Sequence, residues 1–231
     1  MARTLSVKNL YSQRFTTLPI EGKYKEVFDH PSDSGLWIIY GKEKNGKTTF
    51  ALQLANYLST LKRTLYISGE EGMEKEFTAC CMRAGIEETN TGIHFIDYEP
   101  IDELRERLNK RRSESIIFVD NVTVYNDELK NGELRKLQKD YPKKLFIFIA
   151  HEEAGEPYTA TAKLCKRLAK IICHVEGLAC DVSGRCPGGR IIINEEKASL
   201  YYGENLNSEE YGTENETTDQ QEADSETARD L

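Results

Sequence analysis

The segment from residue 41 to residue 49 constrains the fold more than any other part of the chain. It matches the phosphate-binding pattern G-x-x-x-x-G-K-[ST] without a mismatch. Glycines in such a loop let backbone N–H groups turn inward and form a concave nest for phosphate oxygens. We therefore predict that the whole segment binds phosphate: Gly41, Lys42, Glu43, Lys44, Asn45, Gly46, Lys47, Thr48 and Thr49.

The residues around this loop predict a strand before it and a helix after it. Residues 36–40 form an apolar, β-prone run, and residues 48–63 carry apolar side chains at helical spacing. A strand–loop–helix unit brings phosphate to the N-terminus of the helix, at the positive end of its dipole. Lys47 would then face the β- and γ-phosphates, and Thr48 would bind Mg²⁺. The chain is thus expected to bind a nucleoside triphosphate.

Strands and helices alternate along the remaining chain, which predicts an α/β fold with a mostly parallel central sheet flanked by helices. After residues 36–40, the predicted strands cover residues 64–68, 93–98, 115–120, 144–150 and 171–176. A loop is expected at 177–189. Two closely spaced runs then follow, at 190–194 and 198–202, and they predict a C-terminal antiparallel extension of the same sheet.

The formal net charge of −8 is concentrated at the C-terminus. Residues 204–231 hold ten acidic and one basic side chain, whereas the other 203 residues hold 29 acidic and 30 basic ones. This segment has too few apolar side chains to offset the entropy of ordering, so we expect a disordered acidic tail. It would be a solubilising tail or an electrostatic mimic of nucleic acid. Residues 36–203 would form the nucleotide-binding core, with residues 1–35 as a leader packed on it or on a neighbouring subunit.

Composition argues against several classes of protein. No run of 18 apolar residues is present, and the N-terminal residues lack the apolar stretch of a secretory signal. We therefore expect a cytoplasmic protein with no membrane partner. The six cysteines are expected as thiols. A zinc site is not favoured, because Cys173, His174, Cys180 and Cys186 lack the paired spacing of one.

Acidic residues follow two of the predicted strands. Asp120 ends the run at 115–120, and at the carboxyl end of a central parallel strand its carboxylate would face Mg²⁺, directly or through water. Glu70 and Glu71 follow the strand at 64–68, which brings a carboxylate beside the phosphates. Hydrolysis needs such a group to orient and deprotonate water. An exposed pair of loop glutamates is the alternative that composition leaves open.

The order of these motifs resembles that of the RecA-like ATPases. The resemblance rests on the phosphate loop, Ser68-Gly69-Glu70-Glu71, the strand ending at Asp120, and Ala150-His151. Within that family it is greatest to the RadA branch and to the motors of replicative helicases. It implies ATP and Mg²⁺ as cofactors, Glu70 as the catalytic base with Glu71 as the fallback, and His151 as a γ-phosphate sensor. Residues 152–161 would form a DNA-binding loop. A turn histidine that caps a helix is the other interpretation of His151.

The resemblance continues beyond His151. Val175-Glu176-Gly177 and Ser183-Gly184-Arg185-Cys186 look like family segments that carry basic residues into the nucleotide site of a neighbouring subunit. Arg185 would then act in trans as an arginine finger, which implies a homo-oligomer, either a ring or a filament. Ser183 stands where the family has a lysine. Arg190 and Lys197 are therefore competing candidates for the basic role.

The resemblance covers about residues 15–203, a bare motor core with a short leader. In this it is similar to ATP-binding proteins of bacteriophages and mobile elements. It implies an ATPase that acts on single-stranded DNA in replication, recombination or repair, in a bacterial or phage-infected cytoplasm.

Charge gives the DNA partner no independent support, because the core is nearly neutral. Its one basic run, Lys110-Arg111-Arg112, is interpreted as a solvated helix end. Two other functions stay open. One is a nucleotide-gated assembly or signalling ATPase with protein partners and no DNA. The other is a small-molecule kinase, against which the Glu70-Glu71 pair and the lack of an arginine-rich lid argue.

Overall fold

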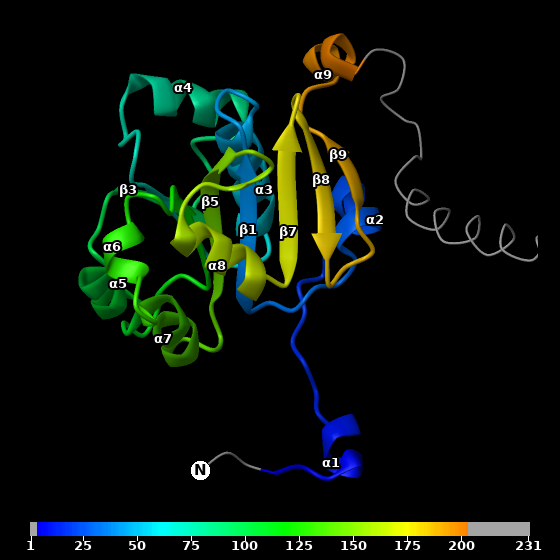
Figure 1. Cartoon of the computed structure of the whole chain (residues 1–231), viewed down its shortest axis with the longest axis vertical. Helices are drawn as coiled ribbons and strands as arrows, with labels where there is room; N and C mark the ends of the chain where they lie inside the picture. Colours follow the sequence, from blue (N-terminus) through cyan, green and yellow to red (C-terminus); the bar gives the residue numbers. More distant parts are fainter. Residues whose placement is uncertain (1–3, 203–231) are drawn as a thin grey trace, which may run out of the picture.

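A nine-stranded sheet runs through the protein and carries helices on both faces (Figure 1). The structure is a computed structural model that describes residues 4–202, so the predicted acidic tail at 204–231 lies outside the described residues. The strands are β1 (Gly35–Gly41), β2 (Thr64–Ser68), β3 (Ile93–Asp97), β4 (Ile116–Asp120), β5 (Leu145–Glu153), β6 (Glu156–Pro157), β7 (Ile171–Glu176), β8 (Ala179–Gly184) and β9 (Gly189–Ile192).

The strand order is β3-β2-β4-β5-β1-β7-β8-β9, and β6 pairs with β5. The six strands from β3 to β7 in this order are parallel, whereas β8 and β9 are antiparallel to their neighbours. We call the side of the sheet where the six parallel strands begin its amino end, and the side where they finish its carboxyl end. The predicted α/β fold, with a mostly parallel sheet and a C-terminal antiparallel extension, is confirmed.

The helices cover the two faces of the sheet in separate groups. They are α1 (Val7–Tyr11), α2 (Lys25–Phe28), α3 (Lys47–Ser59), α4 (Lys75–Arg83), α5 (Ile101–Leu108), α6 (Asn126–Leu129), α7 (Glu133–Asp140), α8 (Ala160–Leu168) and α9 (Glu195–Tyr202), with a 3-10 turn at Gly22–Tyr24. Apolar side chains of α2, α3 and α4 pack on one face, and those of α5, α6, α7 and α8 pack on the other.

The central strand β1 shows how the sequence builds two cores at once. Successive side chains of a strand point to opposite faces. Trp37 and Ile39 join the core under α3, and Ile38 and Tyr40 join the core under α8. Burial on both faces explains the continuous apolar run that predicted this strand. The buried run ends with β1 at Gly41, and the phosphate loop begins there.

The leader contributes to the core of its own chain. Leu18 and Ile20 are buried under the sheet with the residues of α3. Phe28 stacks on Trp37 with ring centroids 5.4 Å apart. A bridge between Thr17 and Ser32 holds this part of the leader beside the start of β1. Helix α1 buries no residue and projects from the body of the protein (Figure 1).

The predictions for the C-terminal part of the core were wrong at two places. The expected loop at 177–189 contains strand β8, which turns back from β7 through Gly177 and Leu178, both with positive φ. The expected strand at 198–202 is part of helix α9. The Asn194 side chain accepts a hydrogen bond from the backbone N–H of Lys197 at 2.9 Å, and this cap starts the helix.

The length and hydropathy of the helices bear on the membrane prediction. Within residues 4–202, no helix is both long enough and apolar enough to cross a bilayer.

Replacing Phe28 with alanine tests whether the leader belongs to the folded core. The change removes a fully buried ring that stacks on Trp37, so we expect the free energy of unfolding to fall by about 3–5 kcal/mol in urea titrations. The matched control is Phe15→Ala, because the Phe15 side chain is 75% exposed and should change stability by less than about 0.5 kcal/mol. Equal stability of the two variants would contradict the assignment.

Candidate functional site

The phosphate loop joins the end of β1 to the start of α3, as its sequence predicts. A side chain at Gly41 would have its Cβ only 2.0 Å from the backbone oxygen of Val175 in β7, so glycine is required there. Gly46 has φ 95°, a left-handed conformation that glycine adopts without a steric penalty. The loop therefore leaves the sheet tightly against β7 and turns directly into the N-terminus of α3.

The turn between β7 and β8 holds the loop in place. The Asn45 side chain accepts a hydrogen bond from the backbone N–H of Gly177 at 2.9 Å. The Leu178 backbone N–H donates to the carbonyl oxygen of Asn45 at 3.3 Å. The Leu178 side chain also covers Gly46, where an added Cβ would lie 2.5 Å from it. The shape of the phosphate loop thus depends on the hairpin that follows β7.

Lys47 begins α3 and is nearly buried. Its ammonium group donates a hydrogen bond to the carbonyl oxygen of Lys42 at 2.7 Å. Burial lowers the pKa of Lys47, and the carboxylates of Asp120, Glu43, Glu70 and Glu152 oppose that shift. The ammonium group is therefore a cation with little water around it, which suits it to bind phosphate oxygens.

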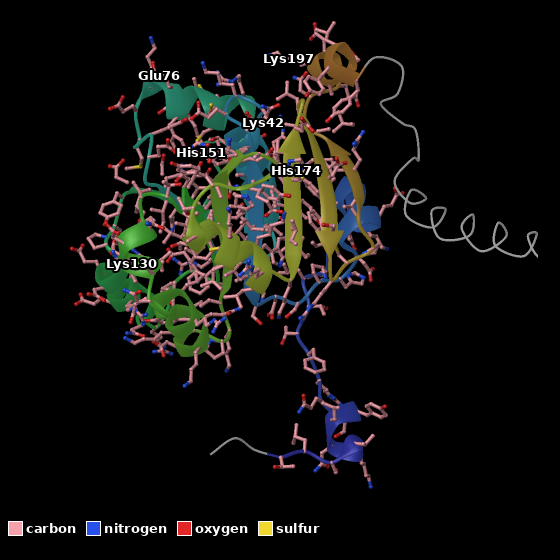
Figure 2. The ribbon with its side chains drawn as sticks, in the orientation of Figure 1. Lys42, Glu76, Lys130, His151, His174 and Lys197 are labelled. Atoms are coloured by element: carbon pink, nitrogen blue, oxygen red, sulfur yellow. The ribbon has the colours of Figure 1, made fainter. Side chains whose placement is uncertain are left out.

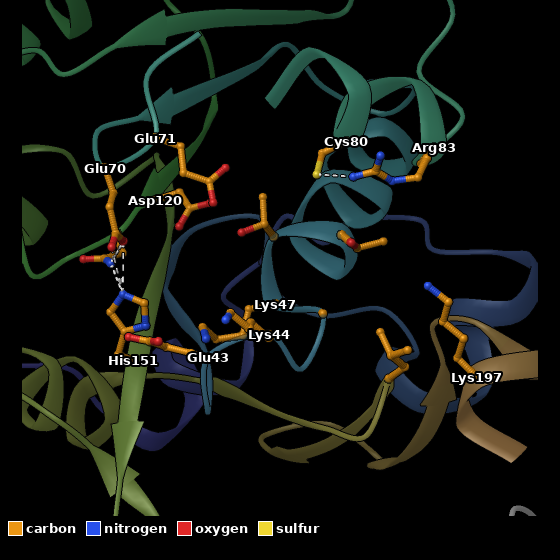
Figure 3. Close-up of a pocket in the computed structure, with 15 residues that line it drawn as sticks. Glu43, Lys44, Lys47, Glu70, Glu71, Cys80, Arg83, Asp120, His151 and Lys197 are labelled. Carbon is orange, nitrogen blue, oxygen red and sulfur yellow. Dashed lines mark hydrogen bonds and ion pairs between the residues drawn. The ribbon is translucent and has the colours of Figure 1, made fainter. Parts of the chain in front are cut away.

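A pocket of about 790 Å³ opens over the phosphate loop. Its size is within the range of small-molecule sites. The acidic residues and His151 lie at one side of the loop, and Cys80, Arg83 and Lys197 lie across it (Figure 3). The lining residues are Glu43, Lys44, Gly46, Lys47, Thr48, Thr49, Glu70, Glu71, Cys80, Arg83, Asp120, Asn121, His151, Leu178 and Lys197.

Asp120 ends β4 and faces this pocket from the carboxyl end of the sheet. Its carboxylate accepts a hydrogen bond of 2.6 Å from the hydroxyl group of Tyr66 on the neighbouring strand β2. Burial raises the pKa of Asp120 to about 6; the Tyr66 hydrogen bond lowers it, Glu71 and Glu70 raise it, and Lys47 lowers it. Ionisation of Asp120 is thus unfavourable when the pocket holds no further cation, and a bound cation would stabilise the carboxylate.

The donor groups fit Mg²⁺ when a nucleotide is present. Mg²⁺ is usually held by one or two carboxylates together with phosphate oxygens and water, not by a cage of protein ligands. Thr48 and Asp120 line the same pocket as Lys47 and match this arrangement. Among residues 4–202, no cluster of three or more His, Cys, Asp or Glu side chains could hold a metal ion by itself. The predicted metal ligands therefore suit an ion that arrives with phosphate.

Glu70 belongs to a cluster of three polar side chains, which come from the segments after β2 and β4 and from strand β5. The His151 Nε2 atom lies 3.0 Å from a Glu70 carboxylate oxygen. The Asn121 amide donates to the same carboxylate and also lies 2.7 Å from His151 Nε2. The Asn121 side-chain oxygen accepts a hydrogen bond from the Thr123 backbone N–H at 2.7 Å, which fixes the orientation of the amide. The structure thus brings together the predicted base and the predicted sensor through a residue that was not predicted.

His151 lies inside strand β5 and not at its end. The strand was expected to finish at Ala150, but it continues to Glu153 and turns back at Ala154-Gly155 into β6. The segment predicted as a DNA-binding loop, residues 152–161, is therefore a short hairpin followed by the start of α8. The Glu152 carboxylate lies 2.7 Å from His174 Nε2, and this contact holds the hairpin against strand β7.

The basic candidates divide between the two ends of the sheet. Arg185 follows β8 at the amino end, where its backbone N–H donates to the Lys170 carbonyl oxygen at 2.7 Å. The phosphate loop lies at the opposite end, so Arg185 does not line the pocket of its own chain. Lys197 on α9 does line it. Arg190 forms an ion pair of 2.7 Å with Asp181.

Sequence reasoning missed four lining residues: Asn121, Cys80, Arg83 and Leu178. Asn121 directly follows Asp120, and this adjacency was an available signal. Arg83 is on α4, where its guanidinium donates to the Cys80 sulfur at 2.8 Å, and only the packing of α4 over α3 brings it to the pocket. Leu178 reaches the loop only through the β7–β8 turn.

Replacing Asn45 with alanine tests the role of that turn. The change leaves the Gly177 N–H without its partner and loosens the loop, so we expect about tenfold weaker binding of a fluorescent ATP analogue. The control is Asn109→Ala, an exposed asparagine at the amino end of the sheet, whose loss should leave the affinity unchanged. An Asn45→Ala protein with wild-type affinity would show that the turn does not support the loop.

Comparison with known proteins agrees with this geometry at the level of the fold. No protein-family model matches the chain, and no curated protein matches its sequence. Solved structures do match. The flagellar accessory protein FlaH from Methanocaldococcus jannaschii has a TM-score of 0.55 at 16% identity, over 76% of this chain and 91% of that one.

Two further solved structures have the same architecture. The KaiC-like protein PH0186 from Pyrococcus horikoshii OT3 has a TM-score of 0.54 at 16% identity, over 75% of this chain and 88% of that one. Another structure, described as an ATPase domain, has a TM-score of 0.51 at 15% identity, over 72% of this chain and 83% of that one. The chain thus has the RecA-like P-loop fold that its motif order predicted.

Proposed function

We propose that this protein is a Mg²⁺-dependent ATPase that works as a homo-oligomer on single-stranded DNA in replication, recombination or repair. The observation that carries the ATPase part is the meeting of Lys47, Thr48, Asp120 and Glu70 in one pocket at the carboxyl end of the sheet. The assignment to the RadA and helicase-motor branch, and to phage or mobile-element proteins, is supported by the motif order alone.

Each residue of the pocket has a role in hydrolysis. Lys47 and the backbone N–H groups of the loop bind the phosphates and neutralise their charge. Thr48 and Asp120 would hold Mg²⁺, which supplies charge stabilisation for the transferred phosphoryl group when it is bound. Glu70 accepts the proton of the attacking water, and Glu71 lies beside it as the fallback.

Asn121 and His151 control the position of that base. In the described state both contact the Glu70 carboxylate, so its lone pairs are partly engaged. A γ-phosphate that draws His151 away would free Glu70 to accept a proton from water. The same movement would act on the hairpin at 152–157, since His151 and this hairpin belong to one strand. His151 thereby serves as a sensor that reports hydrolysis.

The homo-oligomer is supported by the motif resemblance that makes Arg185 an arginine finger. This residue is too far from the pocket of its own chain to line it, so a role as an arginine finger requires a neighbouring subunit. Lys197 is the candidate that would supply a cation within the same chain. An arginine finger on Arg185 thus requires a neighbouring subunit at the nucleotide site, whereas a cation from Lys197 on α9 requires none.

A nucleotide-gated assembly ATPase with protein partners is the second candidate. Two observations favour it. The FlaH structure is described as a flagellar accessory protein. The hairpin in the position of the expected DNA-binding loop also carries three carboxylates, on Glu152, Glu153 and Glu156. Glu156 pairs with Lys166 at 2.9 Å, and Glu152 lies 2.7 Å from His174 Nε2. The hairpin itself carries no cation for phosphate, so it fits a protein partner better than DNA.

Phosphate release with and without single-stranded DNA distinguishes the two functions. We expect wild-type protein to hydrolyse ATP faster when an oligothymidine is added, and Lys47→Ala to lose both nucleotide binding and hydrolysis. Hydrolysis indifferent to DNA, accompanied by ATP-dependent oligomers in light scattering, would favour the second candidate. A wild-type rate no greater than that of Lys47→Ala would contradict an ATPase of either kind.

Replacing Glu70 with glutamine tests the assignment of the base. The amide keeps the shape of the side chain but does not accept the proton of water, so we expect kcat to fall about 10²–10⁴-fold while ATP affinity stays within a few-fold. Glu71→Gln is the matched control and should retain most of the turnover. If Glu71→Gln were the inactive variant instead, the base would be Glu71.

A further inference from the structure

Basic residues gather at the amino end of the sheet, opposite the nucleotide pocket. They lie in the segments that precede β2, β4, β5 and β7 and in the segment that follows β8, and the strand register aligns these segments. The segment before β1 holds no cation, and the segment before the edge strand β3 holds two carboxylates, Glu87 and Glu88, and no cation. In residues 31–34, 62–63, 109–115, 139–144, 169–170 and 185 there are ten cations and three carboxylates. The cations are Lys62, Arg63, Lys110, Arg111, Arg112, Lys139, Lys143, Lys144, Lys170 and Arg185. We call these ten residues the basic row.

Hydrogen bonds connect the segments that carry the basic row. Arg63 donates to the carbonyl oxygen of Arg112 at 2.6 Å, which joins the segments before β2 and β4. Lys144 donates to the carbonyl oxygen of Glu114 at 2.5 Å, which joins the segments before β4 and β5. At the other end of the row, the bond between Arg185 and Lys170 joins β8 to β7. The cations are thus held beside one another by the fold, although they are scattered in the sequence.

The three carboxylates among these segments already have partners. Asp33 pairs with Lys62 at 2.5 Å, and Glu114 lies 2.8 Å from His94. Asp140 pairs with Arg105 at 2.6 Å. Arg63 is the second cation near Glu114, at 3.9 Å. The other exposed members of the row keep their charge available to solvent; they are Lys110, Arg111, Arg112, Lys139, Lys143 and Arg185.

The carboxyl end of the sheet has the opposite charge. Among the described residues, its strand ends and following loops hold eleven carboxylates and two lysines, Lys42 and Lys44, and three further cations line the pocket from helices, Lys47, Arg83 and Lys197. The carboxylates are Glu43, Glu70, Glu71, Glu74, Asp97, Glu99, Asp120, Glu152, Glu153, Glu156 and Glu176. Lys42, His151 and His174 mark this end of the molecule, away from the projecting leader (Figure 2). The core is thus nearly neutral as a whole although its amino end is basic and its carboxyl end is acidic.

We propose that the basic row binds the sugar–phosphate backbone of single-stranded nucleic acid. The row follows six neighbouring strands from β2 to β8, and strands about 4.8 Å apart give it a length of roughly 24 Å. A line of cations of this length suits a linear polyanion and not a compact anion such as free phosphate. This inference rests on the proposed action on nucleic acid, and it moves the contact from the acidic hairpin to the opposite end of the sheet.

The leader favours a single strand over other polyanions. It leaves the body at the same end, because Thr17 bridges to Ser32 just before β1. Phe15 and Tyr11 are 75% and 82% exposed, with Arg14 next to Phe15. Exposed aromatic rings beside a basic surface provide stacking platforms for unpaired bases. An anionic bilayer needs the cations but makes no use of base stacking.

The test uses full-length protein and a fluorescent oligothymidine of about 30 nucleotides, longer than the row so that its ends do not limit binding. The row variant is Arg111→Gln, Arg112→Gln and Lys143→Gln, three exposed side chains remote from the nucleotide pocket. We expect oligothymidine affinity at low salt to fall about tenfold or more, and the salt slope to fall by about 2, since each cation on a single strand contributes about 0.7. Binding of an ATP analogue should be unchanged.

The matched control variant removes three lysines elsewhere, through Lys75→Gln, Lys130→Gln and Lys163→Gln. It should bind oligothymidine as wild type does, because these residues are exposed but do not belong to the basic row. Equal loss in the row and control variants would overturn the inference, since it would show a general charge effect.

Three other outcomes would also overturn the inference, and they bear differently on the proposed function. If the row variant binds oligothymidine as wild type does, nucleic acid is held elsewhere and the proposed function stands. If wild type binds no oligothymidine with or without ATP, both fail. If wild type instead binds phosphatidylserine vesicles, and the row variant does not, the surface is a membrane contact.

Discussion

The close approach of β1 and β7 at Gly41 is the contact on which the nucleotide site depends. Only a residue without a side chain lets the backbone pass Val175 at this distance, so the phosphate loop starts against β7. The β7–β8 turn then lies over the loop and holds Asn45 in place. Lys47, Thr48 and Asp120 gain their positions from the same alignment of strands, because parallel neighbours end together.

The central strands and their helices were predictable because their signals are local. The run around Trp37 is apolar on both faces, and α3 follows a loop whose glycines specify it. The C-terminal part was harder. Residues 198–202 contain two tyrosines and a leucine, which favour a strand, but the Asn194 cap and the burial of Ala198 stabilise a helix. Tertiary packing overrode local propensity there.

The candidate site was predictable where its residues belong to motifs. Lys47, Thr48, Asp120 and Glu70 meet in one pocket because each follows a strand of the same sheet. Asn121 has no motif of its own, and its role appears only when the fold brings β2, β4 and β5 together. The basic run at 110–112 shows the same limit. As a sequence it indicates a solvated helix end, while the fold aligns it with cations from four other segments.

The hairpin of β7 and β8 spans the sheet from one end to the other. Its turn bonds to the phosphate loop through Gly177, and its last residue, Gly184, pairs with Ile171 at the opposite end. One tip of this hairpin, at Leu178, therefore lines the pocket, and the other lies beside Arg185. A shift of the phosphate loop would have to break the bonds to the turn or move the hairpin with it. A single pair of strands thus connects the acidic end of the sheet to the basic end.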